Sequence, residues 1–191
     1  MSNSPSWCPD TFLNAYRFAA EAHRGQTVPG SQGLSYILHV STVAMEVCAA
    51  LTLETFERPN LSVQCALLHD AIEDTAVTYE DVTEHFGPEV ADGVLALTKS
   101  DELDKPEAMI DSLDRIRLCT PDVWIVKLAD RITNLQKPPS KWSAEKRLYY
   151  VDEAQIICDT LGSASPYLAG RIREKMETYR RVYCGDESPI S

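Results

Sequence analysis

The sequence contains no long run of apolar residues. None of its segments approaches the roughly 18 consecutive apolar positions that a membrane-spanning helix requires. The first residues, MSNSPSWCPDTF, also lack the basic stretch and apolar core of a signal peptide. We therefore expect a cytoplasmic protein with no membrane partner.

Basic residues are also in short supply. The 191 residues include 18 Lys and Arg against 29 Asp and Glu, which gives a formal net charge of −11, and no long basic run occurs. Nucleic acids and anionic membranes both select proteins with a basic surface. We therefore expect no nucleic-acid partner.

Cysteine pairs with the spacing of metal ligands are absent as well. The six cysteines are scattered, and none forms the CxxC pair that binds structural zinc or carries redox chemistry. Most of them stand in apolar surroundings, so we interpret them as reduced thiols of a cytosolic protein.

The apolar residues recur with helical spacing almost throughout, and alternating, strand-like runs are scarce. The chain is long enough for one hydrophobic core, so we expect a single domain over residues 1–191, with its core at about 10–183 and frayed termini. The expected fold class is all-α, a bundle of eight or nine helices. These are expected at about residues 10–25, 36–51, 60–74, 78–87, 88–98, 107–119, 122–136, 144–161 and 166–183.

Several residues mark where these helices begin. Asn60 and Ser143 are expected N-caps, and Thr78 with Asp81 resembles a capping box. The charged segment 99–106 is poorly periodic and is expected to form a mobile loop.

The segment LLHDAIEDT, residues 67–75, places an imidazole and three carboxylates within an apolar stretch. Residues three and four apart share a helix face, so His69 is expected over Glu73, and Asp70 over both Glu73 and Asp74. A buried charge normally has a partner or a metal. Imidazole with carboxylate suits Mn²⁺, Fe²⁺ or Zn²⁺.

Two further polar residues on apolar helix faces, His39 and Asp130, are candidates to complete a metal site. Each alone has an ordinary explanation: a lone core histidine is usually hydrogen-bonded, and Asp130 beside Arg131 fits a salt bridge. Four such residues on three apolar helices favour a shared metal.

The order His39, His69–Asp70, Asp130 matches the H…HD…D signature of the HD metal-dependent phosphohydrolase superfamily. The sequence motifs around it resemble those of the hydrolase domain of the RelA/SpoT family, and they occur in the same order over about residues 10–160. No synthetase or regulatory domain is seen, so the chain resembles a stand-alone small alarmone hydrolase. The similar motifs are AHRGQ (22–26), YILHV (36–40), ALLHDAIEDT (66–75), FGPEVADGVLALTK (86–99) and VKLADRITNL (126–135).

This resemblance implies an HD-domain bundle that removes the 3′-pyrophosphate of a nucleotide such as (p)ppGpp or (p)ppApp, as in the stringent response. The implied cofactor is one Mn²⁺, with Fe²⁺, Zn²⁺ or Mg²⁺ as alternatives. Glu73 and Asp74 would position the attacking water and manage protons. The implied metal ligands are His39, His69, Asp70 and Asp130.

The resemblance also implies substrate contacts. Asn134 would contact the nucleoside, and Tyr150 matches a tyrosine that reaches the nucleotide in related small hydrolases. Arg24, Lys99 and Arg131 flank the expected site and are candidates for the phosphates. For each of these cations a solvated surface role is an equal alternative.

The segment after AHRGQ departs from the family pattern. Guanine-specific hydrolases usually carry an Arg–Lys pair there, which stacks on and hydrogen-bonds the base, whereas this chain has Val28 and Pro29. Ser35 replaces the usual proline before Tyr36. The hydrolytic residues are intact, so we expect a base preference that is relaxed or shifted toward adenosine nucleotides.

Other functions stay open at this point. A different HD nucleotidase or dNTP phosphohydrolase would use the same metal site, and a non-catalytic nucleotide-sensing module is the alternative from another class. His23 is expected to be structural, with contact to the substrate pocket as the alternative, and His85 to lie at a helix end. The base, the native metal, the oligomeric state and the biological role are left undetermined.

Overall fold

The computed structural model describes residues 6–185, which form ten α-helices; within this range the only strand-like pairing is one bridge between Thr27 and Ser35. The all-α expectation is confirmed. A 3₁₀ turn (Gly162–Ala164) precedes the last helix, and a π-helical turn (Arg180–Cys184) follows it. The helices are α1 (Pro9–Ala22), α2 (Ile37–Leu53), α3 (Pro59–Leu68), α4 (Ala71–Asp74), α5 (Tyr79–Phe86), α6 (Pro88–Leu97), α7 (Lys105–Leu118), α8 (Pro121–Asn134), α9 (Ala144–Leu161) and α10 (Pro166–Tyr179).

The sequence signals account for most helix starts. The Thr78–Asp81 capping box and the Ser143 cap are confirmed. Helices α1, α3, α6, α8 and α10 each begin at a proline, whose fixed φ suits the first helical position. The expected cap at Asn60 is wrong, because Pro59 already opens α3 and the Asn60 side chain accepts from the backbone amide of Cys8 at 2.7 Å.

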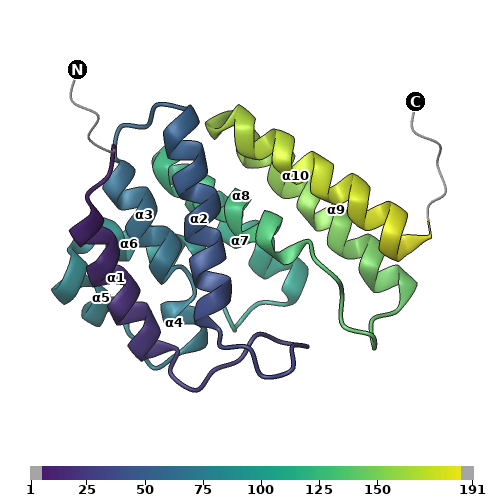
Figure 1. Ribbon diagram of the computed structural model, residues 1–191, viewed down its shortest axis with the longest axis horizontal. Helices are drawn as coiled ribbons and strands as arrows, with labels where there is room; N and C mark the ends of the chain where they lie inside the picture. The colour runs from purple at the N-terminus through teal and green to yellow at the C-terminus, as the bar shows by residue number, and fades with distance from the viewer. Residues whose placement is uncertain (1–5, 186–191) are drawn as a thin grey trace.

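Helix α8 lies at the centre of the molecule, in contact with α2 and α3 on one side and with α9 and α10 on the other (Figure 1). It is buried almost all round, including the polar side chains Lys127, Asp130 and Arg131. No described helix is long and apolar enough to cross a membrane. A polar side chain on α8 is therefore forced to find its partners inside the protein.

The expected helix 60–74 is wrong as one continuous element, because the chain breaks at His69–Asp70 into α3 and α4. Asp70 has φ −101° and ψ 0°, the bridge conformation found in turns and active sites. In a continuous helix, consecutive side chains diverge by about 100°. The break lets two consecutive residues, His69 and Asp70, face one cluster.

Two further expectations concern the number of domains and the segment 99–106. The expected single domain over residues 1–191 stays a prediction, and the expected fraying of the termini falls mostly on residues outside the described range 6–185. Residues 99–104 of the segment expected as a loop connect α6 and α7, but the expectation is wrong for Lys105 and Pro106, which open α7 after its N-cap Asp104.

Candidate active site

Four side chains from three parts of the chain converge beneath the N-terminal end of α2. Donor atoms of His39, His69 and Asp70 all lie within 4.8 Å of one another. Asp130 from α8 brings its Oδ1 to 3.5 Å from Nε2 of His39 and 3.9 Å from Nε2 of His69. The structure thus brings all four predicted metal ligands together.

The ring of His69 is oriented by the backbone. Its Nδ1 lies 2.9 Å from the carbonyl oxygen of Ala66, so that nitrogen donates and Nε2 faces the cluster, 2.9 Å from Oδ2 of Asp70. Burial alone would lower the pKa of His69, but the charges of Asp70 and Asp130 and the hydrogen bonds raise it to about 9. A backbone-anchored imidazole with its second nitrogen toward carboxylates is typical of a metal-binding histidine.

Tyr36 fixes the carboxylate of Asp70. Its hydroxyl donates to Oδ2 of Asp70 at 2.5 Å. Burial would raise the pKa of Asp70, but His69, His39 and this hydroxyl hold it well below its usual range. Burial, and after it the charge of Asp70, raises the pKa of Tyr36, so the phenol remains a donor. Asp70 therefore stays ionised.

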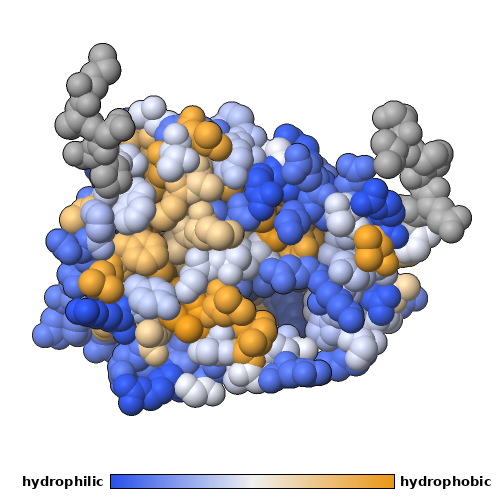
Figure 2. Space-filling model, viewed as in Figure 1, coloured by the Kyte–Doolittle hydropathy of each residue, from blue (hydrophilic) through white to orange (hydrophobic). Residues whose placement is uncertain are grey.

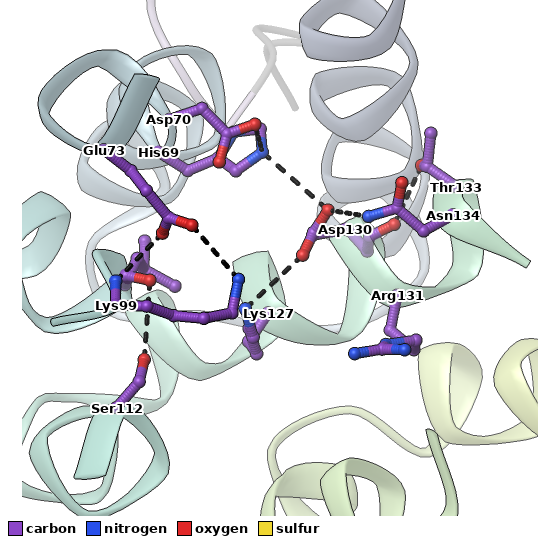
Figure 3. A network of polar contacts seen from close by, with 12 residues as sticks. His69, Asp70, Glu73, Lys99, Ser112, Lys127, Asp130, Arg131, Thr133 and Asn134 are labelled. Atoms are coloured by element: carbon purple, nitrogen blue, oxygen red, sulfur yellow. Dashed lines mark hydrogen bonds and ion pairs between the residues drawn. The ribbon is translucent and has the colours of Figure 1, made fainter. Parts of the chain in front are cut away.

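Lys127 is a site residue that the sequence analysis missed. It is 4% exposed, and its Nζ lies 3.5 Å from Oδ2 of Asp130 (Figure 3). Burial lowers the pKa of Lys127, while the charge of Asp130 opposes this shift. Its position three residues before Asp130, on the same apolar helix, is the signal that identifies it.

The donor set fits a divalent ion. Two imidazole nitrogens and two carboxylates converge, and neutral imidazole with carboxylate oxygen is a ligand set for Mn²⁺, Fe²⁺ or Zn²⁺. Tyr36 donates to Oδ2 of Asp70 and Asn134 donates to Oδ1 of Asp130, the oxygens that also face the imidazoles. Lys127 donates to the other oxygen of Asp130, Oδ2. Such supporting hydrogen bonds are what a metal site needs to keep its ligands oriented.

Glu73 lies beside this cluster and is held by Lys99. The backbone amide of Lys99 donates to Oε2 of Glu73 at 2.9 Å, and its Nζ donates to Oε1 at 3.2 Å (Figure 3). Ser112 on α7 donates to the carbonyl of Ala96 at 2.9 Å, which ties down the end of α6 that leads to Lys99. The expectation that Glu73 stacks beneath His69 on one helix is wrong, because the helix is broken between them.

Asp74 ends α4. Asp74 is exposed, and its backbone carbonyl accepts from the side-chain amide of Gln26 at 2.6 Å. Burial, and after it the charge of Asp70, raises the pKa of Asp74 above its usual value. A carboxyl with this shift holds a proton more readily than its neighbour Asp70.

The predicted substrate residues have different surroundings. The side chain of Arg24 is 75% exposed and pairs with Glu21 on the same helix end. Arg131 is buried, with its guanidinium 4.3 Å from the ring centroid of Tyr150 and 3.5 Å from Glu153. Arg131 and Tyr150 therefore form one unit, and the contact of each with substrate stays a prediction.

A hollow opens in the molecular surface beside the N-terminal end of α2 (Figure 2). That end of α2 carries His39, preceded by Tyr36. The exposed apolar side chains Leu34 and Leu38 belong to the same region. A molecule that enters here would approach the cluster from the side of the α1–α2 connection.

The remaining histidines are placed as expected for structural residues. His85 lies at the end of α5, where its Nδ1 is 2.8 Å from the carbonyl of Asp81. His23 is 2% exposed, and its Nδ1 contacts the side-chain oxygen of Gln26 at 2.6 Å.

Comparison with known proteins agrees with this geometry. A family model described as HD domain matches residues 15–162. The guanosine-3′,5′-bis(diphosphate) 3′-pyrophosphohydrolase MESH1 of Mus musculus is 31% identical over 169 residues, which cover 86% of this chain and 92% of that protein. The bifunctional (p)ppGpp synthase/hydrolase SpoT of Escherichia coli is 35% identical over 172 residues, 86% of this chain but 20% of that protein.

A solved structure extends the likeness to three dimensions. It is described as a metazoan ortholog of SpoT that hydrolyzes ppGpp and plays a role in starvation responses. It superposes with a TM-score of 0.77 at 28% identity, covering 93% of this chain and 98% of that one.

Proposed function

The chain belongs to the HD domain family, and we propose that it is a metal-dependent hydrolase that releases pyrophosphate from the 3′ position of an alarmone nucleotide such as (p)ppGpp or (p)ppApp. The observation that carries this proposal is the convergence of His39, His69, Asp70 and Asp130 on one point, with Glu73 beside them. Relatives that match over most of this chain and of their own length are named 3′-pyrophosphohydrolases.

The four converging side chains would hold one divalent ion, and we propose Mn²⁺ as the native one. When bound, such an ion lowers the pKa of water and polarises a phosphoryl oxygen. The protein's own part is to keep the two carboxylates ionised and to hold the ligands in their orientations. Tyr36 does this for Asp70, Lys127 and Asn134 for Asp130, and the Ala66 carbonyl for His69.

Glu73 would orient the attacking water, and Asp74 would handle the proton of the leaving group. Glu73 is fixed by two hydrogen bonds from Lys99, which suits a carboxylate that orients a water molecule. Asp74 has a raised pKa, which suits a group that passes a proton to the leaving 3′ oxygen. Both roles require the carboxyl groups to keep their positions when substrate binds.

Cationic side chains near the site would offset the charge of the phosphates. The protein carries a net charge of −11, so a polyphosphate needs local positive charge to approach. Lys99 has 40% of its side chain exposed beside Glu73, and Arg24 is exposed at the end of α1. We assign the nucleoside side of the substrate to Asn134 and to the Arg131–Tyr150 unit.

The base preference would differ from that of guanine-specific relatives. Residues 26–36 of the α1–α2 connection, QTVPGSQGLSY, contain no lysine or arginine. Val28 and Pro29 cannot supply the cation stacking and hydrogen bonds that an Arg–Lys pair gives a base. We therefore propose that adenosine alarmones, (p)ppApp and pApp, are hydrolysed at least as well as their guanosine counterparts.

Steady-state hydrolysis of ppGpp, pGpp, ppApp and pApp by the purified Mn²⁺-loaded protein tests both the proposed reaction and the proposed base preference. Release of pyrophosphate with comparable or higher kcat/KM for the adenosine nucleotides is the expected result. A strong guanine preference would overturn the base assignment alone. Release of single phosphates, or no turnover of any of the four, would overturn the alarmone assignment. Asp70→Ala controls for contaminating hydrolases.

A further inference from the structure

We propose that His23 and Gln26 are positioning residues that hold Asp74 in its catalytic place, through a hydrogen-bonded link from α1 to the backbone of α4. The inference rests on the catalytic role proposed for Asp74. It assigns a function to the AHRGQ segment, which contributes none of the metal ligands.

The link has two short hydrogen bonds. The side-chain amide of Gln26 donates to the backbone carbonyl of Asp74 at 2.6 Å. The side-chain oxygen of Gln26 lies 2.6 Å from Nδ1 of His23. His23 is the C-cap of α1, and its own amide donates to the carbonyl of Ala19 at 2.9 Å, so the link starts from a fixed helix end.

The direction of each proton follows from the partners. The carbonyl of Asp74 only accepts, so Gln26 must present its NH₂ group there and turn its oxygen toward His23. Nδ1 of His23 must then carry the proton. Nε2 is buried and has no hydrogen-bond partner among the described residues, which fits a bare nitrogen, because burying an unpaired N–H would cost more.

The α1–α2 connection is hydrogen-bonded to both ends of α4. At one end, the hydroxyl of Tyr36 donates to the side chain of Asp70; at the other, Gln26 donates to the carbonyl of Asp74. Tyr36 and Gln26 are also bonded to each other, since the backbone amide of Tyr36 donates to the carbonyl of Gln26 at 3.0 Å. The ring of His23 also packs on that of Tyr36, with centroids 4.9 Å apart.

Helix α4 depends on such external support. It has only four residues, and a single helical turn has no stability of its own. Figure 1 shows α4 at the same end of the molecule as the C-terminal end of α1 and the start of α2. A carboxyl group displaced by about 1 Å can lose about 100-fold in rate. His23 itself, at 2% exposure, is too buried to touch substrate.

Replacements of His23 test the link because they keep, move or remove the group that donates to the side-chain oxygen of Gln26. Asparagine places its NH₂ near the position of Nδ1, glutamine places it near Nε2, and leucine has no donor. We expect His23→Leu and His23→Gln to lower kcat by about 10-fold or more, with KM and Mn²⁺ affinity unchanged. His23→Asn is expected to retain most of kcat, and His85→Asn, at an exposed helix end, is the matched control.

The kinetic comparison has outcomes that overturn the inference. Equal kcat in His23→Leu and wild type would do so, and so would His23→Asn that is no better than His23→Gln at equal folded fraction. A fall in Mn²⁺ affinity as large as the fall in kcat would show a general loss of the site instead of displacement of Asp74.

Two measurements on the metal-free protein are independent of turnover. Imidazole ¹⁵N shifts are expected to show His23 protonated at Nδ1 and bare at Nε2, and amide exchange at residues 74–77 is expected to quicken in His23→Leu but not in His23→Asn. The opposite tautomer, or unchanged exchange in His23→Leu, would overturn the link. If wild type hydrolyses none of the four nucleotides while both measurements agree with expectation, the proposed function fails and the link stands.

Discussion

Lys99 holds the carboxylate of Glu73 at both oxygens, with its backbone amide on Oε2 at 2.9 Å and its Nζ on Oε1 at 3.2 Å. Glu73 thus has partners of its own, separate from the four converging ligands. The residues proposed to hold the ion and the residue proposed to orient water are consequently separable by mutation.

Glu73→Gln is expected to leave Mn²⁺ bound while lowering kcat by about 100-fold or more, because an amide keeps the shape of the carboxylate but lacks its charge and its second acceptor oxygen for orienting water. Asp74→Asn is expected to behave in the same way. Metal content by elemental analysis, together with pyrophosphate release, measures the two effects. Full activity in both carboxamide variants would show that neither side chain has the proposed role.

His69→Ala and Asp70→Ala are expected to abolish both Mn²⁺ binding and turnover, since each removes a donor from the converging set. Isothermal titration with Mn²⁺ measures the first loss and the nucleotide assay the second. His85→Ala, which removes a histidine from an exposed helix end, is expected to change neither. Undiminished Mn²⁺ affinity in His69→Ala would place the ion elsewhere.

Tyr36→Phe is expected to weaken Mn²⁺ binding by about 10- to 100-fold, because it removes the donor that orients Asp70 while leaving every ligand in place. Tyr79→Phe is the matched control, since the Tyr79 hydroxyl makes a similar bond to the surface residue Asp92 at 2.8 Å. Equal Mn²⁺ affinity in the two variants would show that the hydroxyl of Tyr36 does not support the site.

Gly93→Ala is expected to destabilise the fold by about 1–3 kcal/mol, although alanine is the better helix former. A Cβ at position 93 would lie 2.7 Å from Sγ of Cys65 and 3.2 Å from Cγ2 of Val123, where α6 packs on α3 and α8. Gly170→Ala on α10 meets nothing within 4 Å and should instead stabilise. Urea unfolding measures both, and Cys65→Ala should rescue part of the loss in Gly93→Ala.

The carboxyl group of Asp81 is expected to make the stability of the fold depend on pH. Hydrogen bonds from the backbone and side chain of Thr78 hold the pKa of Asp81 below its usual value. A lowered folded-state pKa contributes stability above the unfolded pKa, and this stability is lost as the pH falls through the folded value. Asp81→Ala should therefore lower Tm at pH 7 and have less effect in strong acid. An effect of the same size at both pH values would exclude this contribution.

The convergence of the four proposed metal ligands was predictable from the sequence because a polar residue in an apolar helix face stands out against its neighbours. His39 and Asp130 lie in buried stripes that periodicity alone reveals. The capping box at Thr78 was predictable for a similar reason, since both of its hydrogen bonds form within four residues.

Contacts between distant segments were not predictable in this way. The break at His69–Asp70 gives up helical hydrogen bonds in favour of a convergence with α2 and α8, which local propensity does not register. Arg131 faces Tyr150 and Glu153 on α9, and Gln26 faces the backbone of Asp74. Each of these partners is set by packing, so only a three-dimensional structure reveals it.

The division of the ligands among α2, the end of α3 and α8 also bears on how the protein is made. The first ligand is at position 39 and the last at position 130, so no fragment that stops short of α8 contains the set. During synthesis from the N-terminus, a chain could capture the ion only after α8 had emerged and packed on α2 and α3. Metal capture would thus require α8, although α9 and α10, which also carry core residues, emerge later, and chains truncated before α8 would lack the ion however well their first helices form.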